Sequence, residues 1–226
     1  TKSGELIEQA SRLIVATLSA RMRGDTVVVV AVFTFLAFML GAMPFSFWLG
    51  RLFLRTDIRH YGDGNPGAAN AWRAGSWRIG VPALLLDYLK GALPVGLAHF
   101  HAGISGWWLV PLAPVLGHAF SPFLRFHGGK AVAVTFGVWS GITLGEGPIV
   151  FGILLSVLVL VQDADAWATI LGMLGLGVYL LWRQADIATL AIWSGNSLIL
   201  VWKHRRDLGR PPKLRPVFLK LVRRER

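Results

Sequence analysis

The stretch from Thr26 to Met43, TVVVVAVFTFLAFMLGAM, is eighteen residues long and contains no charged side chain. Its apolar character continues to Leu49, shortly before Arg51. When coiled into an α-helix, an uncharged apolar run of this length matches the hydrocarbon thickness of a lipid bilayer. The run therefore predicts a first transmembrane helix and a membrane-embedded fold.

The composition of the whole chain supports a membrane protein. Of its 226 residues, 54% are hydrophobic and 15% are charged, and the mean hydropathy is +0.55. A soluble domain with this composition would leave too much apolar surface in water. The absence of cysteine excludes disulfides and thiolate metal sites. The formal net charge of +11 comes from side chains at the ends of apolar runs, so we expect no nucleic-acid partner.

Six more apolar runs follow the first. Several are shorter than the usual ~20 residues, which indicates tilted or partial spans. The sequence thus predicts an all-α, polytopic integral membrane helical bundle of about seven transmembrane helices, the last six at Ile79–His101, Ile104–Phe126, Ala131–Leu144, Ile149–Val161, Trp167–Trp182 and Ile187–Trp202.

The chain divides into three parts. In residues 1–25, apolar residues such as Leu6 and Leu13 recur at helical spacing between charged ones. This pattern predicts an amphipathic helix in the membrane interface, although the end of an upstream domain is an alternative. Residues 26–202 form the multi-span domain, and residues 203–226 form a basic tail suited to anionic lipid headgroups.

The positions of Lys and Arg predict the orientation of the bundle. With seven spans, one side carries the arginines from Arg51 to Arg78, then Arg125 and Lys130, and the basic tail. The other side carries far fewer. Because loops rich in Lys and Arg stay in the cytoplasm, we expect these loops and the C-terminus to be cytoplasmic.

Two charged residues, Asp87 and Lys90, lie within the run Ile79–His101, three residues apart and so on one helix face. A charge near the bilayer centre costs about 2.5–3.5 kcal/mol on insertion scales, so both should face the bundle interior. They are interpreted as an ion pair that braces the bundle or as a functional pair, for example the charge relay of a transporter. Bracing is favoured, because the polar loops gather on one side, whereas a transporter's site lies near the midplane.

A glycine-rich stretch, GDGNPGAANAWR at Gly62 to Arg73, separates the first two spans. Glycine lets backbone N–H groups approach a ligand closely and adopts positive φ without strain, which suits a loop that wraps an anion. Exposed polar backbone does not face lipid. We therefore expect this loop at the membrane surface or in a watery cavity.

Two other polar clusters fall on the same predicted side. One is Gly117-His118 with Gly128-Gly129-Lys130, and the other is Lys203 to Arg206. Each alone is a weak signal. Together with the Gly62 loop they predict a site with exposed amides, fixed positive charge and two imidazoles at the bilayer edge. Such a site suits phosphate-bearing substrates with lipid tails.

Several motifs occur in order from Gly41 to Lys213: Gly41-x-x-Pro44, Gly50-Arg51-Leu52, Asp57-Ile58-Arg59, Gly62-x-Gly64-Asn65-Pro66-Gly67-Ala68-x-Asn70, Leu85-Leu86-Asp87 with Lys90-Gly91, Gly117-His118-x-Phe120, Gly128-Gly129-Lys130 and His204-Arg205. This order resembles the bacterial acyl-phosphate:glycerol-3-phosphate acyltransferase family. The resemblance implies a seven-span enzyme of the bacterial inner membrane with a cytoplasmic-side active site. It would transfer an acyl group from acyl phosphate to the 1-hydroxyl of glycerol 3-phosphate, giving lysophosphatidic acid without a cofactor.

The resemblance also implies roles for individual residues. His118 and His204 are expected to orient or deprotonate the hydroxyl, a task suited to a pKa near neutrality, with Lys130 as the third catalytic residue. The substrate phosphates are expected to bind Arg51, Arg59, Gly62, Gly64, Asn65, Gly67, Asn70, Gly128 and Gly129. No metal site is expected, since His99 and His101 are interpreted as an interfacial pair.

Six positions depart from the family pattern: Ala42, Asp63, Ala69, Ala131, Val134 and Asp207. Most of them lack a hydroxyl or amide that the family usually carries, and two add a carboxylate near the proposed phosphate site. The alternative hypothesis is therefore a catalytically degenerate member that serves as a structural or lipid-holding subunit of a larger membrane complex. The expected partners are the lipid bilayer, the two substrates and, on this alternative, other membrane subunits.

Overall fold

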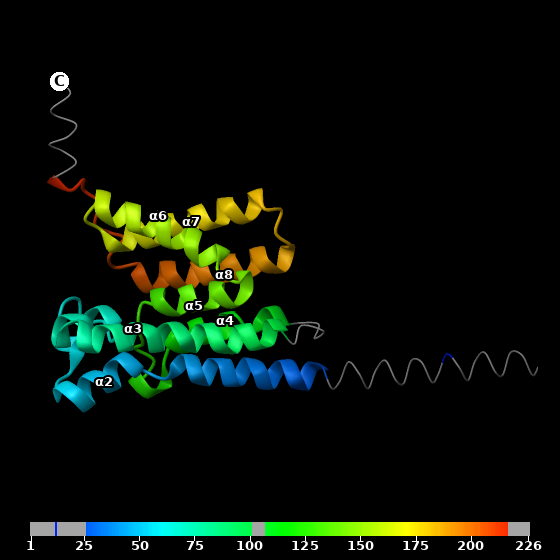
Figure 1. The fold of residues 1–226 in the computed structure, drawn as a ribbon, viewed down its shortest axis with the longest axis horizontal. Helices are drawn as coiled ribbons and strands as arrows, with labels where there is room; N and C mark the ends of the chain where they lie inside the picture. Colours follow the sequence, from blue (N-terminus) through cyan, green and yellow to red (C-terminus); the bar gives the residue numbers. More distant parts are fainter. Residues whose placement is uncertain (1–11, 13–25, 101–106, 217–226) are drawn as a thin grey trace, which may run out of the picture.

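A computed structural model describes residues 26–100 and 107–216, together with residue 12. Within these ranges the chain is a bundle of helices that run roughly along one direction (Figure 1). The all-α prediction is confirmed. The predicted interfacial helix over residues 1–25, apart from residue 12, lies outside the described residues, and so does the basic tail beyond residue 216.

The helices follow the predicted apolar runs. After a first helix over residues 26–42 come α2 (Phe45–Leu54), η1 (Ile58–His60), α3 (Ala68–Phe100), η2 (Trp107–Leu109), α4 (Leu112–Ala119), η3 (Pro122–Leu124), α5 (Val132–Thr143), α6 (Glu146–Val161), α7 (Asp165–Trp182) and α8 (Ile187–His204). Four stretches of the described chain are long and apolar enough to cross a membrane, namely Thr26–Leu54, Ala68–Phe100, Trp107–Leu124 and Asp165–Trp182, while α5 and α6 are shorter apolar helices.

Several helix boundaries differ from the sequence prediction. The described part of the predicted span Ile104–Phe126 is divided into η2, α4 and η3, of which only α4 is an α-helix. The helix α3 begins at Ala68 rather than near Ile79, with a kink at Gly75 and Ser76, whose backbone angles are not helical. The second half of the glycine-rich stretch is therefore helix, not loop. The predicted turn at residues 145–148 is also shorter, because α6 begins at Glu146. Pro148 lies in its first turn, where a missing N–H is tolerated.

Close backbone contact holds α3 against α5. A Cβ on Gly137 would overlap the carbonyl oxygen of Tyr88, and one on Gly91 would overlap that of Val134. Small residues at such contacts let membrane helices approach closely and gain dispersion energy. The main core lies among α5, α6, α7 and α8, around the fully buried Trp139. The indole N–H of Trp139 donates to Asn196 Oδ1 at 3.2 Å.

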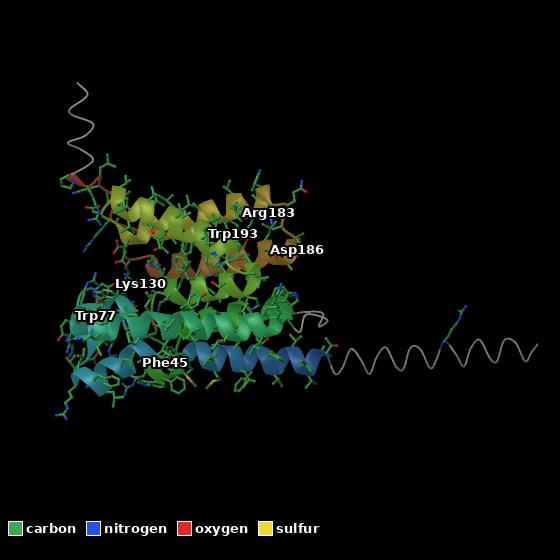
Figure 2. All side chains as sticks on the ribbon, in the orientation of Figure 1. Phe45, Trp77, Lys130, Arg183, Asp186 and Trp193 are labelled. Atoms are coloured by element: carbon green, nitrogen blue, oxygen red, sulfur yellow. The ribbon has the colours of Figure 1, made fainter. Side chains whose placement is uncertain are left out.

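Large apolar side chains are exposed along the helices, for example Leu85 of α3, Val157 of α6 and Leu174 of α7. Figure 2 places Lys130 and Trp77 toward one end and Arg183 and Asp186 toward the other. The Gly62 loop and the segment before α5 thus share one end, here called the polar end. This arrangement matches a bilayer around the middle of the bundle.

The buried charges of α3 pair with each other, as the sequence predicts. Lys90 Nζ lies 2.7 Å from Asp87 Oδ1, and both residues are almost fully buried. Asp87 also accepts a hydrogen bond from Ser46 Oγ at 2.6 Å, and Lys90 donates to the Met43 carbonyl at 2.9 Å. The pair therefore ties α3 to the break between the first helix and α2.

Candidate functional site

The first component of the site is the loop from Gly62 to Gly67, which is folded back on the start of α3. Gly62 and Gly64 adopt φ of 57° and 75°, the left-handed region that favours glycine. From the first turn of α3, the Asn70 side-chain amide donates to the Asn65 carbonyl and to Asp63 Oδ1, both at 2.9 Å. Arg73 in turn donates to Asn70 Oδ1 at 2.7 Å. The loop is thus held in one conformation by side chains of the helix that follows it.

The second component is the segment Gly128-Gly129-Lys130 before α5. The Gly129 N–H donates to the His118 carbonyl at 3.0 Å, so the segment returns to the end of α4. A Cβ on Gly129 would overlap the His118 ring at Nε2, which explains the requirement for glycine. From α8, Lys203 Nζ donates to the carbonyls of Ala119 and Gly128, each at 2.9 Å. Lys203 thereby fixes the third component, the end of α8, against the second.

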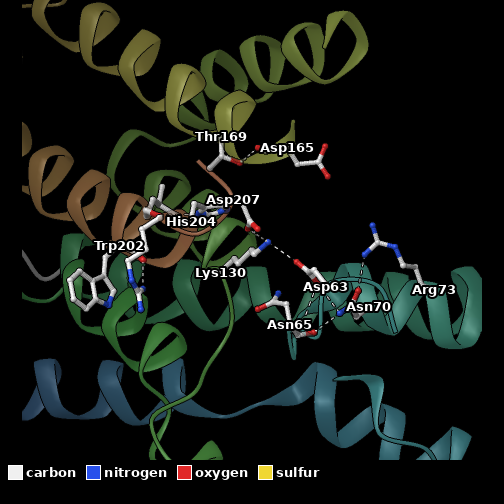
Figure 3. A network of polar contacts seen from close by, with 12 residues as sticks. Asp63, Asn65, Asn70, Arg73, Lys130, Asp165, Thr169, Trp202, His204 and Asp207 are labelled. Carbon is white, nitrogen blue, oxygen red and sulfur yellow. Dashed lines mark hydrogen bonds and ion pairs between the residues drawn. The ribbon is translucent and has the colours of Figure 1, made fainter. Parts of the chain in front are cut away.

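Lys130 joins all three components (Figure 3). Its Nζ lies 2.5 Å from Asp63 Oδ2 of the Gly62 loop and 2.6 Å from Asp207 Oδ2, which follows α8. Only about a quarter of the Lys130 side chain is exposed, against 38% for Asp63 and 44% for Asp207. The predicted convergence of three distant segments therefore occurs, and one ammonium group lies at its centre.

Lys130 and Asp63 are held in their ionised forms. Burial opposes charge on Lys130, but its hydrogen bonds to Asp207 and Asp63 raise its pKa above the ordinary value. Burial would raise the pKa of Asp63, yet the ion pair with Lys130 and the hydrogen bonds from Asn65 and Asn70 lower it. At neutral pH the centre is therefore an ammonium between two carboxylates.

Both predicted histidines are buried beside this centre. His204 is 3% exposed and its Nδ1 lies 2.8 Å from the Leu200 carbonyl oxygen. Because a carbonyl only accepts, we assign the proton of the neutral ring to Nδ1 and the lone pair to Nε2. His118 is 7% exposed, and its Nδ1 lies 3.8 Å from Asp87 Oδ1, too far for a hydrogen bond.

Three adjacent cavities meet at Lys130 and Asp63. The inner cavity, of about 450 Å³, is lined by polar residues that include His118 and His204 and by apolar residues of α3, α5 and α6. The outer cavity, of about 520 Å³, opens past Arg73, Asp207 and Arg210. The basic cavity, of about 360 Å³, is lined by His127, Lys203, Arg205 and Arg206 among others.

The predicted phosphate-binding residues divide into three groups. Gly64, Asn65, Gly67 and Gly128 line the cavities. Gly62, Asn70 and Gly129 do not line these cavities but contact residues that do. Gly62 lies against Arg73, Asn70 donates hydrogen bonds to Asp63 and Asn65, and Gly129 lies against the His118 ring. Arg51 and Arg59 do not line the three cavities described here and instead bind the buried Asp57, at 3.1 and 2.6 Å.

Asp57 also accepts from the Arg59 backbone N–H at 3.0 Å and so begins η1. The side-chain hydrogen bond from Arg59 outweighs the effect of burial and holds the pKa of Asp57 well below its usual range. This ion-pair cluster shapes the chain between α2 and the Gly62 loop. In this structure Arg51 and Arg59 therefore support the site from outside it.

The sequence analysis assigned no individual role to three residues of the site: Arg73, Lys203 and Asp207. Arg73 lines the outer and inner cavities, and the other two hold Gly128 and Lys130 in place. The helical start at Ala68 was the missing signal for Arg73, since it places Arg73 three residues after Asn70 on the same helix face. The partners of Lys203 and Asp207 lie at the end of α4 and in the segment before α5, so no local sequence pattern indicates them.

Four of the six departures from the family pattern line the cavities. Asp63, Ala69 and Ala131 line the inner one, and Asp207 lines the outer one. Ala131 has φ of 63°, so its Cβ costs about 1 kcal/mol relative to glycine at this position. Ala42 and Val134 are instead buried in helix contacts. Among the described residues, no group of three or more His, Asp and Glu is arranged to hold a metal ion.

Comparison with known proteins identifies the family. The model of the glycerol-3-phosphate acyltransferase family matches residues 31–212. Glycerol-3-phosphate acyltransferase 1 of Thermotoga maritima is 38% identical over 189 residues, covering 76% of this chain and 93% of that protein. The enzyme of Aromatoleum aromaticum is 38% identical over 180 residues, covering 76% and 87%.

A solved structure has the same fold. It is PlsY (YgiH), an integral membrane glycerol 3-phosphate acyltransferase, in its glycerol 3-phosphate form. The two chains share 27% identity with a TM-score of 0.75, over 80% of this chain and 91% of the other. The chain therefore belongs to the glycerol-3-phosphate acyltransferase family.

Proposed function

We propose that this integral membrane protein transfers an acyl group from acyl phosphate to the 1-hydroxyl of glycerol 3-phosphate. The products are lysophosphatidic acid and inorganic phosphate. The observation that carries the proposal is the position of Lys130, a charged ammonium where three cavities meet. All three cavities are lined by further cationic groups, and the inner one is also lined by apolar side chains. The proposed reaction brings together two phosphates and one acyl chain, which is the combination that these cavities suit.

The cationic side chains and loop amides serve to bind the phosphates. Arg73 reaches the outer cavity from α3, and Lys203 and Arg205 reach the basic cavity from the end of α8. Between them the backbone of Gly64 and Gly128 lines the basic cavity. Guanidinium groups bind phosphate with paired hydrogen bonds, and amides of a glycine-rich loop add further donors.

The inner cavity suits an acyl chain that reaches the reacting carbonyl from the bilayer. Its apolar wall includes Leu84 of α3, Phe136 of α5 and Leu155 of α6. The same cavity is also lined by His118 and His204. A chain held along the apolar wall would bring its terminal carbonyl toward Lys130.

The reaction moves one proton from the hydroxyl to the departing phosphate and needs no cofactor. The glycerol hydroxyl oxygen attacks the acyl carbon while the hydroxyl proton passes to His204 Nε2. The carbon–oxygen bond to the phosphate then breaks, and His204 gives the proton to the phosphate oxygen, so that inorganic phosphate leaves and the imidazole is neutral again. Phosphate is a good leaving group, so positioning of the substrates and stabilisation of the oxyanion supply most of the rate enhancement. Lys130 is placed to stabilise that oxyanion or the departing phosphate.

An assay with purified protein in lipid nanodiscs tests the proposal. We expect lysophosphatidic acid from acyl phosphate and radiolabelled glycerol 3-phosphate. Acyl-coenzyme A, whose thioester has no phosphate at the acyl carbon, should give at most a few per cent of that rate. A rate with acyl phosphate no higher than that of a Lys130→Met variant would refute the proposal. If acyl-coenzyme A reacted at an equal rate, glycerol 3-phosphate would remain the proposed acceptor, but acyl phosphate would be rejected as the specific donor.

The degenerate-subunit alternative gains no support. The relatives named above are enzymes, and the two added carboxylates, Asp63 and Asp207, are both paired with Lys130. The described site thus retains Lys130, and Arg73, Lys203 and Arg205 line the cavities beside it.

We also propose that the polar end of the bundle faces the cytoplasm, as the distribution of Lys and Arg predicts. Since the chain has no cysteine, single-cysteine variants can test this directly. His60 and Gln184 are both exposed, and they flank opposite ends of the membrane spans. In intact spheroplasts a membrane-impermeant maleimide should label Gln184→Cys and leave His60→Cys unlabelled until the cells are lysed. The opposite pattern would invert the topology.

A further inference from the structure

The two carboxylates that bind Lys130 differ in how firmly they are held. Asp63 accepts from the backbone N–H of Asn65 at 3.2 Å and from the side-chain amide of Asn70 at 2.9 Å, in addition to Lys130. It is thus part of the folded Gly62 loop. Asp207 is the more exposed of the two, and the described polar contact of its carboxylate is with Lys130 alone.

The backbone around Asp207 leaves its side chain free to turn. Asp207 lies beyond the end of α8, and its N–H donates to the His204 carbonyl at 2.8 Å within a turn. Its side chain borders the outer cavity, where Figure 3 shows it on the opposite side of Lys130 from Asp63. A rotation about its side-chain bonds would therefore release Lys130 without any change in the helices.

We propose that Asp207 sets the affinity for the phosphate substrate by occupying, in the empty site, the place on Lys130 that a substrate phosphate takes. Binding then exchanges one anion for another: the phosphate oxygen replaces Asp207 at Nζ, and Asp207 turns into the outer cavity. Asp63 stays in place, because its other two donors hold it. This inference rests on the proposed function, since it assigns the substrate's phosphate to Lys130.

The exchange lowers the affinity for phosphate in two ways. The substrate must displace a charge-assisted hydrogen bond, which is about twice as strong as a neutral one. After displacement, a carboxylate remains near the bound dianion and repels it, although solvent screens much of that repulsion at a partly exposed site. An asparagine at position 207 would keep an oxygen acceptor for Lys130 and remove the charge. The substitution Asp207→Asn therefore isolates the electrostatic contribution.

The test is a comparison of three variants in detergent or nanodiscs by isothermal titration calorimetry, with glycerol 3-phosphate and with inorganic phosphate. We expect Asp207→Asn to lower the Kd for both by about 10-fold. Asp165→Asn is the matched control. It removes a carboxylate from the same outer cavity, and Asp165 is not a described partner of Lys130, so we expect a change of less than about 2-fold. Asp63→Asn should weaken binding, because it loosens the Gly62 loop.

Steady-state kinetics give a second readout. Asp207→Asn should lower the KM for glycerol 3-phosphate and leave kcat within about 3-fold of the original protein. An unchanged or higher Kd in a variant with unchanged thermal unfolding would overturn the inference. If Asp207→Asn unfolds more readily, Asp207→Ser, which also removes the charge, must show the same gain in affinity. If Asp207→Asn bound phosphate more tightly but neither it nor the original protein transferred an acyl group, the role of Asp207 would be supported and the proposed function refuted. The two proposals can therefore fail separately.

Discussion

Replacing Lys130 with methionine is expected to lower the rate of lysophosphatidic acid formation by about 100- to 1,000-fold, the effect of removing one charged donor from a preorganised site. Methionine fills similar space without charge or donors. The loss should appear in kcat as well as in KM, because Lys130 lies where both the oxyanion and a phosphate would be stabilised. The measurement is acyl transfer with saturating acyl phosphate, together with thermal unfolding of each variant.

Two further variants make the result specific to Lys130. Lys213→Met removes a lysine that lines the outer cavity but whose described polar contacts are through its backbone to Asp163, so its rate should stay within about 3-fold. Lys130→Met combined with Asp207→Asn relieves the repulsion between the two carboxylates that Lys130 leaves behind, and should recover stability but not activity. If Lys130→Met retained more than a tenth of the original rate, Lys130 would be a structural residue only.

The membrane fold could be predicted from the sequence because hydropathy reports it almost directly. Each of the predicted apolar runs contains a helix in the described structure, since a backbone inside lipid must satisfy its own hydrogen bonds. The lengths of the apolar runs predicted the lengths of the helices less accurately. The run that begins at Ile79 extends back to Ala68 as α3. The four alanines and Arg73 in the segment Ala68 to Ala74 are good helix formers, but they follow a stretch rich in glycine and asparagine that was interpreted as loop.

The candidate site could be predicted only in part. Its three segments lie on the same side of the bilayer, and this follows from counting spans and charges. Which charged side chains form ion pairs with one another cannot be predicted in this way. Arg51 and Arg59 are as basic in the sequence as Arg73, yet a 3₁₀ turn beginning at Asp57 takes both as partners. Pairing of this kind depends on loop geometry and on residues up to 77 positions apart, such as Lys130 and Asp207, which no local pattern encodes.

The remaining prediction concerns the buried pair Asp87 and Lys90 and has the largest expected effect on stability. Lys90→Met leaves an unpaired carboxylate in the bundle interior and should lower the free energy of unfolding by about 3–5 kcal/mol. Asp87→Asn should cost a similar amount, because Lys90 then keeps only the Met43 carbonyl among its described hydrogen bonds. Chemical unfolding in mixed micelles, followed by tryptophan fluorescence, measures both.

The surface pair Glu146–Arg183 supplies the matched control. Its side chains are 54% and 53% exposed and 3.3 Å apart, so Arg183→Met should cost less than about 1 kcal/mol. A loss on Lys90→Met no greater than that of Arg183→Met would show that the buried pair does not brace the bundle.

The double variant Asp87→Asn/Lys90→Met separates bracing from catalysis. Removing both charges also removes the cost of burying each of them. The stability of the double variant should therefore return to within about 2 kcal/mol of the original protein. The two substitutions would then be non-additive, which is expected only for residues that interact. Asp87 lines the inner cavity beside His118, so a catalytic role would have a different signature. If the pair only braces, acyl transfer at a temperature where every variant is folded should stay within about 3-fold of the original in the double variant. Recovered stability with a rate still 100-fold low would instead place Asp87 among the catalytic residues, acting on His118.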